Sequence, residues 1–211
     1  MHELVGGDLP YPSLSIGRHM GQPLTKPIID FASYIAERTF EFTGREWVFK
    51  AINDWLVDTG EPRFFLLTGH PGSGKTAIAA RLAQLSQGEL SPPPDLSSLR
   101  PNFLSAVHFC FARDRRWINP HTFTESLAMQ LAARLPAYAL ALAEKGGDSK
   151  IRIEVVQNIE NVRDGTVVGV AIERLDVSVV SAEDAFIRVI REPLEALRGS
   201  FDEQVIILPA Q

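Results

Sequence analysis

The chain has 211 residues, of which 45% are apolar and 22% are charged. These values are ordinary for a globular protein, and the length suffices for one α/β domain with a core, or for one domain plus a short arm. The net charge of −5 argues against general nucleic-acid binding, because that binding depends on Lys and Arg side chains that neutralise phosphates.

The cysteine count and the hydrophobic pattern indicate the cellular environment. The sequence has a single cysteine, Cys110, which excludes a disulfide within the chain and argues against a cysteine-based zinc site. No stretch approaches the roughly 18–20 apolar residues that a membrane helix needs. The first residues have neither the basic start nor the apolar block of a signal peptide. We therefore expect a cytoplasmic protein that does not span a membrane.

The N-terminal part is predicted to be an arm followed by helices. Residues 1–26 are rich in Gly, Pro and Ser and show no period, and Pro27 suits the first turn of a helix that ends near Arg38. Thr43 and Glu46 have capping-box spacing, which predicts a helix over 44–58. We therefore divide the chain into an arm with a short helix, residues 1–41, and a domain over residues 42–211.

An apolar run over 63–68 predicts a strand that is covered on both faces, as in a parallel sheet. The run leads into a glycine-rich loop and a predicted helix over 75–87, which Gly88 closes. A proline-rich linker over 91–101 separates this helix from a second predicted apolar strand over 105–111.

The second half of the domain combines helices and strands. Asn119 followed by Pro120 predicts the start of a helix that Pro136 breaks, with further turns to about residue 144. Alternation over 151–177 predicts a β-hairpin or a pair of strands. Ser181 has the spacing of a helix cap with Asp184, and we expect Pro193 to interrupt the helix. An apolar run over 204–208 predicts the last buried strand.

The glycine-rich loop carries the clearest chemical signal, because it fits the phosphate-loop pattern at every fixed position. Glycines allow successive backbone N–H groups to point at a phosphate, and the following helix presents its positive N-terminus to the same anion. Lys75 adds a charge near the β- and γ-phosphates, and the Thr76 hydroxyl is placed to ligate Mg²⁺. The alternative is an ordinary glycine turn before a lysine. The predicted site for ATP and Mg²⁺ consists of Gly69, His70, Pro71, Gly72, Ser73, Gly74, Lys75 and Thr76.

Several segments together resemble a known family. They are Gly44-Arg45-Glu46, the amphipathic helix after it, RFFLLTGHPGSGKT, and HFCFARDRRWINPHTF. In this combination the chain resembles, over about residues 42–211, the bacterial NACHT-like ATPases of the STAND class, which are signal-transducing ATPases with numerous domains. The resemblance implies an α/β fold of the P-loop NTPase type, with three α/β/α layers, a mostly parallel sheet and the hairpin as an insertion. It implies that Gly44 and Arg45 lie near the adenine; the alternative is a turn and an exposed helix start.

The resemblance also implies a function. In this class the ATP state controls a signalling or defence output on other domains, so we expect partners within a larger signalling protein, and an oligomer is compatible with this. The chain departs from the class after the strand predicted over 204–208, where Pro209 and Ala210 replace the expected aspartate-rich motif. We therefore expect an incomplete P-loop domain and identify no catalytic residue. The alternatives are an ATP-binding interaction fragment without hydrolysis and a small-molecule P-loop kinase.

Other candidate site residues have simpler interpretations. Arg113, Arg115 and Arg116 could sense a γ-phosphate or grip a nucleic acid with Trp117 stacked on a base. We favour a solvated loop with Trp117 packed on the core. His108 alternates with apolar neighbours, which favours a hydrogen-bonded core histidine. Neither His108 nor His70 has another His, Cys or carboxylate at the spacing of a metal site. We expect Cys110 to pack in the core.

Overall fold

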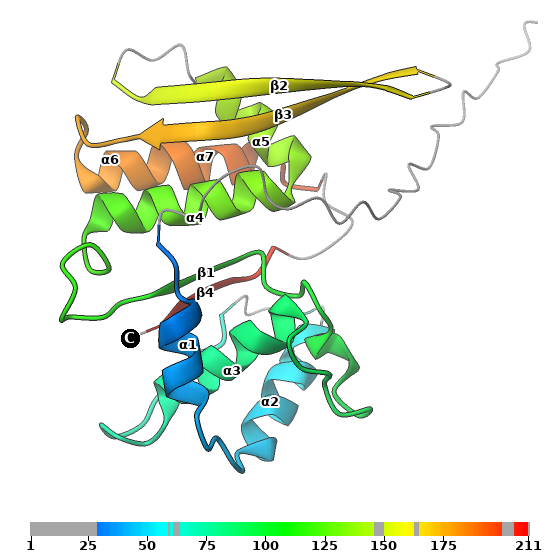
Figure 1. Ribbon diagram of the computed structural model, residues 1–211, viewed down its shortest axis with the longest axis vertical. Coiled ribbons are helices and arrows are strands. Elements are labelled where there is room, and N and C mark those ends of the chain that lie inside the picture. Colours follow the sequence, from blue (N-terminus) through cyan, green and yellow to red (C-terminus); the bar gives the residue numbers. More distant parts are fainter. Residues whose placement is uncertain are drawn as a thin grey trace, which may run out of the picture.

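The computed structural model describes residues 29–58, 60, 64–145, 150–162, 165–199 and 205–210, which form a mixed α/β structure (Figure 1). The described helices are α1 (Ala32–Thr39), α2 (Glu46–Val57), α3 (Lys75–Gln87), α4 (Pro120–Arg134), α5 (Pro136–Glu144), α6 (Ala182–Phe186) and α7 (Glu192–Ala196), with a 3₁₀ turn η1 (Ser97–Leu99) and a π turn η3 (Ile187–Arg191). The described strands are β1 (Ala106–Phe109), β2 (Arg152–Val162), β3 (Gly165–Asp176) and β4 (Ile207–Ala210).

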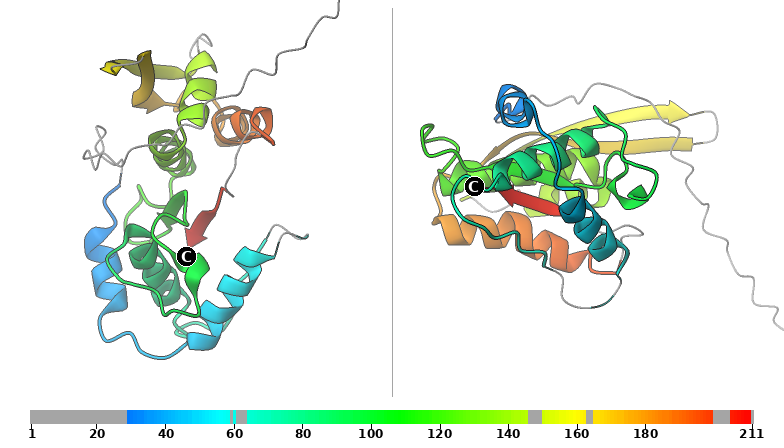
Figure 2. Two further views of the ribbon diagram at one scale, coloured as in Figure 1. Left: turned by 90° about the vertical axis from the view of Figure 1, so that its right-hand side faces the viewer. Right: turned by 90° about the horizontal axis from the view of Figure 1, so that it is seen from below.

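The elements are arranged in layers around a small parallel sheet. β1 and β4 pair in parallel, with Ala106 opposite Ile207. α1, α2 and α3 lie on one side of this pair and α4 lies on the other, as Figures 1 and 2 show. Beyond α4 lie α5, α6 and α7 together with the antiparallel hairpin β2–β3. The helix α4 therefore separates the two sheets.

The helix α3 was predicted at its observed bounds, and it packs on two sides. Three small residues of α3 face α1 and β1, and three larger ones face α2. The small ones are Ala79, Ala80 and Ala83, and the larger ones are Ile78, Leu82 and Leu85. Gly88 ends the helix with φ 76°, and its N–H donates to the carbonyls of Gln84 and Leu85. This is the left-handed C-terminal cap that glycine favours.

Three other local predictions are confirmed. The Asn119 side chain accepts hydrogen bonds from the N–H groups of His121 and Thr122 at 2.9 and 3.1 Å, and Pro120 begins α4. Ser181 Oγ accepts from the N–H of Asp184 at 3.1 Å at the start of α6. The predicted hairpin is β2–β3. Each is a short-range signal that packing did not override.

Two predicted helix starts differ from the structure. α1 begins at Ala32, whose N–H donates to Asp30 Oδ1 at 2.9 Å, whereas Pro27 lies outside the described residues. The predicted capping box of Thr43 and Glu46 is wrong. α2 begins at Glu46, so Glu46 is the first helical residue instead of the third, and no side chain caps the helix. Arg45 occupies the N-cap position, with φ 71°.

The strand predicted over 63–68 is wrong for the described residues 64–68, which adopt no strand. Phe64 and Leu66 are 86% and 84% exposed. The strand predicted over 204–208 is found as β4, which ends at Ala210, two residues beyond the predicted end. The carbonyl of Ile206, directly before β4, accepts hydrogen bonds from the N–H groups of Ser105 and Ala106, and the carbonyl of Ala210 in β4 accepts from the N–H of Cys110. Alternate residues of a strand point their backbone groups the same way, so Pro209 faces the edge opposite β1, where it offers no N–H. A further strand paired with that edge would lack one hydrogen bond.

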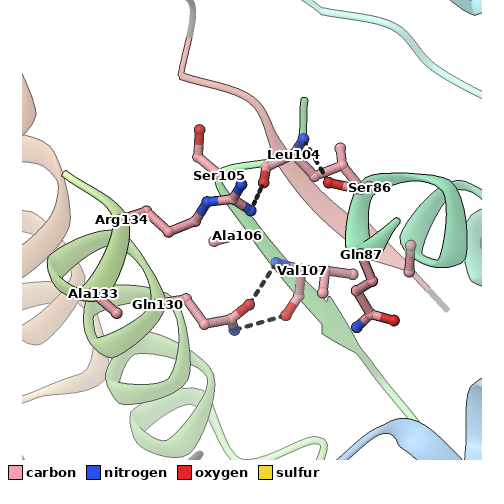
Figure 3. Close-up of a pocket in the computed structure, with 10 residues that line it drawn as sticks. Ser86, Gln87, Leu104, Ser105, Ala106, Val107, Gln130, Ala133 and Arg134 are labelled. Carbon is pink, nitrogen blue, oxygen red and sulfur yellow. Dashed lines mark hydrogen bonds between the residues drawn. The ribbon is translucent and has the colours of Figure 1, made fainter. Parts of the chain in front are cut away.

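The other edge of the parallel pair is covered by side chains, as Figure 3 shows. The Gln130 amide accepts from the N–H of Val107 at 3.0 Å and donates to its carbonyl at 2.8 Å, as a neighbouring strand would. The N–H of Leu104 donates to Ser86 Oγ at 3.0 Å, and its carbonyl accepts from Arg134. A cavity of about 170 Å³ lies among these groups. Such covering satisfies an edge strand and discourages association with other chains.

A proline explains the π turn between α6 and α7. Pro193 has no N–H to donate to the carbonyl of Val189, four residues earlier, and its ring crowds that carbonyl. The backbone widens there, and the N–H of Glu192 donates to Ile187, five residues back. The buried Tyr138 hydroxyl of α5 donates to the Val189 carbonyl instead. The predicted interruption at Pro193 is thus a local widening before a continued helix.

Candidate functional site

The glycine-rich loop forms a tight turn directly before α3. Gly72 and Gly74 have φ values of 78° and 89°, in the left-handed region that side chains disfavour. A Cβ on Gly69 would lie 2.7 Å from Ser73 Oγ, so the loop closes on itself at that point. The N–H of Ser73 also donates to the carbonyl of His70 at 3.1 Å. Backbone conformation therefore requires glycine at 72 and 74, whereas a side chain at 69 would require the Ser73 hydroxyl to move.

The Lys75 ammonium group lies across this loop. Lys75 Nζ donates to the carbonyl of Gly69 at 2.9 Å and to that of His70 at 3.1 Å. Lys75 is the first residue of α3, so its charge sits at the positive end of the helix. The ammonium group and the N-terminus of α3 thus meet at the loop, and both attract an anion.

The remaining predicted loop residues lie around the same turn. Thr76 is the second residue of α3 and is half-buried. His70 and Pro71 are exposed at the outside of the turn. The loop thus gathers a lysine, a hydroxyl and backbone groups at one helix start, which is the donor set that a phosphate and its Mg²⁺ require.

Arg45, at the N-terminal end of α2, contacts the same loop. Its Nη2 donates to the carbonyl of Ser73 at 3.3 Å, across 28 residues of sequence. Gly44 and Arg45 both have positive φ values, 74° and 71°, and this double left-handed turn sets the start of α2 beside the loop. A left-handed conformation is uncommon for an arginine. The structure therefore places Gly44 and Arg45 next to the predicted phosphate loop.

The structure agrees with the simpler interpretations of the arginine cluster and of the core histidine. Trp117 is buried among Phe31 and Tyr34, with its ring at 4.8 and 5.1 Å from theirs, so its packing on the core is confirmed. Arg116 pairs with Asp114 at 2.7 Å and lowers the pKa of that carboxyl group, while the cluster around them stays largely exposed.

His108 is fully buried on β1, as predicted for a core histidine. Its Nε2 lies 2.9 Å from the carbonyl of Trp117, so Nε2 carries the proton. Nδ1 is then a bare acceptor, and it has no partner among the described residues. Burial lowers the pKa of His108, which favours the neutral ring. Burial also raises the pKa of the Cys110 thiol, which favours its protonated form.

Two further searches cover the described part of the chain. It contains no group of three His, Cys, Asp or Glu side chains that could hold a metal ion. None of its helices has the length and apolar character needed to cross a membrane. The sequence analysis missed Gln130, although a lone amide within the apolar stretch 127–132 is a signal that it satisfies a buried polar group.

Fold and site together define a mixed α/β protein with a small parallel sheet and a glycine-rich turn at the start of a helix. Residues 44–162 match the family described as Nephrocystin 3, N-terminal. The match spans more than half of the chain, so the protein belongs to the nephrocystin 3 N-terminal family, and the matched range contains both Arg45 and the glycine-rich loop. Neither the curated proteins nor the solved structures give a match. The resemblance to NACHT-like ATPases stays a prediction.

Proposed function

We propose that this chain is the ATP- and Mg²⁺-binding module of a nucleotide-dependent switch of the NACHT/STAND type. The observation that carries the proposal is the position of Lys75, whose ammonium group lies inside the glycine-rich loop at the start of α3. The layers of helices on both sides of the β1–β4 pair support a P-loop NTPase architecture. The family match includes this loop.

The chain's own residues have separate roles in this proposal. The loop backbone between Gly69 and Gly74 presents N–H groups to the phosphates, and Lys75 exchanges its two carbonyl acceptors for phosphate oxygens. The Thr76 hydroxyl is the protein ligand for Mg²⁺, which neutralises phosphate charge when it is bound. Arg45, already 3.3 Å from the Ser73 carbonyl, supplies a second cation at the rim of the loop.

The consequence for partners follows from the resemblance. A switch module changes its contacts with other domains or proteins according to the nucleotide it holds, so the partners of this chain are a nucleotide and the remainder of a signalling assembly. The exposed apolar side chains beside the loop, at Phe64 and Leu66, are compatible with such contacts.

A second candidate is ATP binding without hydrolysis. It is favoured by Pro209, which follows the four apolar residues 205–208 at the position where a hydrolytic enzyme of this class carries an Mg²⁺-associated aspartate. Pro209 has no acidic group and faces the edge of β4 that no described strand occupies. Release of inorganic phosphate from Mg-ATP, measured at the same protein concentration as binding, separates the two candidates. Turnover that disappears in Lys75→Ala favours the switch ATPase, whereas binding with no release above background favours the second candidate.

Calorimetric titration with Mg-ATP tests the proposal itself. Lys75→Ala removes a charged donor to the phosphates, a loss of about 1.5–3 kcal/mol, which corresponds to roughly 10–150-fold weaker binding. The matched control is Lys50→Ala, because Lys50 lies on α2 and its ammonium group pairs with Asp54 at 2.9 Å instead of entering the loop. We expect the control to bind as the wild type does. Equal affinity of wild type and Lys75→Ala, or no heat with either, would overturn the proposal.

A further inference from the structure

The segment that joins α1 to α2, residues 40–45, has an unfavourable backbone conformation. Glu41, Gly44 and Arg45 have φ values of 55°, 74° and 71°, so three of its residues are left-handed and two of these carry side chains. A left-handed backbone is uncommon for residues with a Cβ, and it persists where surrounding contacts hold it. Arg45, the last residue of the segment, contacts the glycine-rich loop through the Ser73 carbonyl. The contacts that hold the segment therefore decide where the Arg45 guanidinium group lies.

Arg81, on α3, makes two contacts at the start of this segment. Its guanidinium carbon lies 4.9 Å from the centre of the Phe42 ring, which is within the range of a cation–π interaction. Its Nη2 donates at 3.5 Å to the carbonyl of Thr39, the last residue of α1, where the helix dipole also favours a cation. The N–H of Phe42 donates to the same carbonyl at 3.1 Å. Arg81 thus contacts the end of α1 and the segment together.

Phe42 is also held by α2. Its ring meets the Phe49 ring edge to face, with 5.9 Å between the ring centres, and it packs on the apolar cluster that α2 and α3 share. Arg81 follows Lys75 by six residues on α3, which is about 9 Å along the helix axis. Because both residues belong to one helix, the contact at Phe42 and the loop at Lys75 keep a fixed separation.

We propose that Arg81 is a positioning residue for nucleotide binding, which holds the segment 40–45 so that Arg45 lies at the glycine-rich loop. The inference rests on the proposed function, since the position of Arg45 matters only if the loop binds Mg-ATP. Arg81 acts through Arg45 instead of touching the nucleotide. Without Arg81 the segment relaxes toward ordinary backbone conformations, and the Arg45 guanidinium group leaves the Ser73 carbonyl. A cation that is already in place binds phosphate more tightly than a mobile one, because less entropy is lost on binding.

Calorimetric titration of Arg81→Met, Arg45→Ala and the double variant with Mg-ATP tests this role. Methionine keeps an unbranched apolar stem but removes the charge. We expect Arg81→Met to weaken binding several-fold, at most by the loss that Arg45→Ala causes, and to cause no further loss in the Arg45→Ala background. A general loss of structure would instead weaken binding by the same factor in both backgrounds. The matched control is Arg38→Met, because the Arg38 guanidinium group lies 5.0 Å from the Tyr34 ring within α1 itself. We expect the control to bind as the wild type does.

Hydrogen exchange of the Phe42 amide gives a readout that needs no nucleotide. This N–H donates to Thr39 beside the Arg81 contact, so it should exchange several-fold faster in Arg81→Met than in the wild type. A second variant, Phe42→Leu, removes the aromatic face but keeps an apolar side chain. It should lose the same Mg-ATP affinity as Arg81→Met, so the role can be tested even if one of the two variants does not fold. Thermal unfolding identifies the folded variants.

The outcomes separate the role of Arg81 from nucleotide binding itself. If the wild type binds Mg-ATP and a folded Arg81→Met binds equally well, the positioning role is overturned and the proposed function stands. An equal loss with and without the Arg45 side chain, or unchanged exchange of the Phe42 amide, also overturns it. If the wild type does not bind Mg-ATP, the proposed function and the positioning role both fall. A loss of affinity that requires Arg45, together with faster exchange at Phe42, supports the role.

Discussion

Replacing Tyr138 by Phe isolates one buried hydrogen bond. The Tyr138 hydroxyl donates to the Val189 carbonyl, which cannot accept the usual helical hydrogen bond from residue 193 because Pro193 has no N–H. Tyr138 and Val189 are both fully buried, so water cannot substitute for the lost donor. Phenylalanine keeps the ring and opens almost no cavity. The expected cost is therefore that of one unsatisfied buried acceptor, about 1–3 kcal/mol in the free energy of unfolding.

Thermal and urea unfolding measure this cost. For a chain of this size each kcal/mol corresponds to about 2–4 °C in the unfolding midpoint. Pro193→Ala provides the control, because alanine restores an N–H that can donate to Val189. The Tyr138→Phe change should then cost less in the Pro193→Ala background than in the wild type. A loss below about 0.5 kcal/mol, which is the size of an ordinary surface change, would refute the reasoning. Equal losses in both backgrounds would also refute it.

Three further predictions concern the loop, the core histidine and the sheet edge. Arg45→Ala should weaken Mg-ATP binding several-fold in calorimetry, because it removes a cation beside the loop. Arg116→Ala, which breaks only the surface ion pair with Asp114, should leave binding unchanged. Equal effects of the two substitutions would show that Arg45 is not part of the site. Because burial lowers the pKa of His108, the unfolded chain takes up the proton first, so the free energy of unfolding should fall as the pH drops below 6.5. His108→Gln should reduce the slope of stability against pH below about pH 6.5, as measured by urea unfolding, and an unchanged slope would contradict this. Gln130→Leu leaves the N–H and carbonyl of Val107 unpaired and should lower the free energy of unfolding by about 2–4 kcal/mol. Light scattering should also show more self-association of this variant. A stable, monomeric variant would show that the edge of β1 does not need the Gln130 side chain.

Local signals in the sequence predicted most of the elements. The bounds of α3 follow from the glycine on each side of it, and the caps at Asn119 and Ser181 are satisfied by groups within three residues. The hairpin follows from alternation. These features depend on neighbours in the chain, so no knowledge of the fold is needed to find them. The loop conformation belongs to the same group, since it depends on its own glycines.

The errors arose where a distant residue decides the outcome. The sequence of 64–68 predicts a strand, but a strand forms only beside a partner strand, and among the described residues none pairs with this segment. The start of α2 depends on the left-handed turn that sets Arg45 against Ser73. The role of Gln130 depends on the edge of β1, which sequence spacing does not show. Long-range pairing of this kind overrides local propensity.

The separation of β1 and β4 along the chain affects the order of folding. The two strands lie about a hundred residues apart, and the segment between them buries most of one hydrophobic cluster by itself. Closing such a long loop early is entropically costly, whereas contacts among α4, α5, the hairpin and α6 are local. We therefore expect the segment 120–199 to become structured first, which brings its two ends together before β1 and β4 meet. The parallel pair that joins the layers would then be the last part of the fold to form and the first to open.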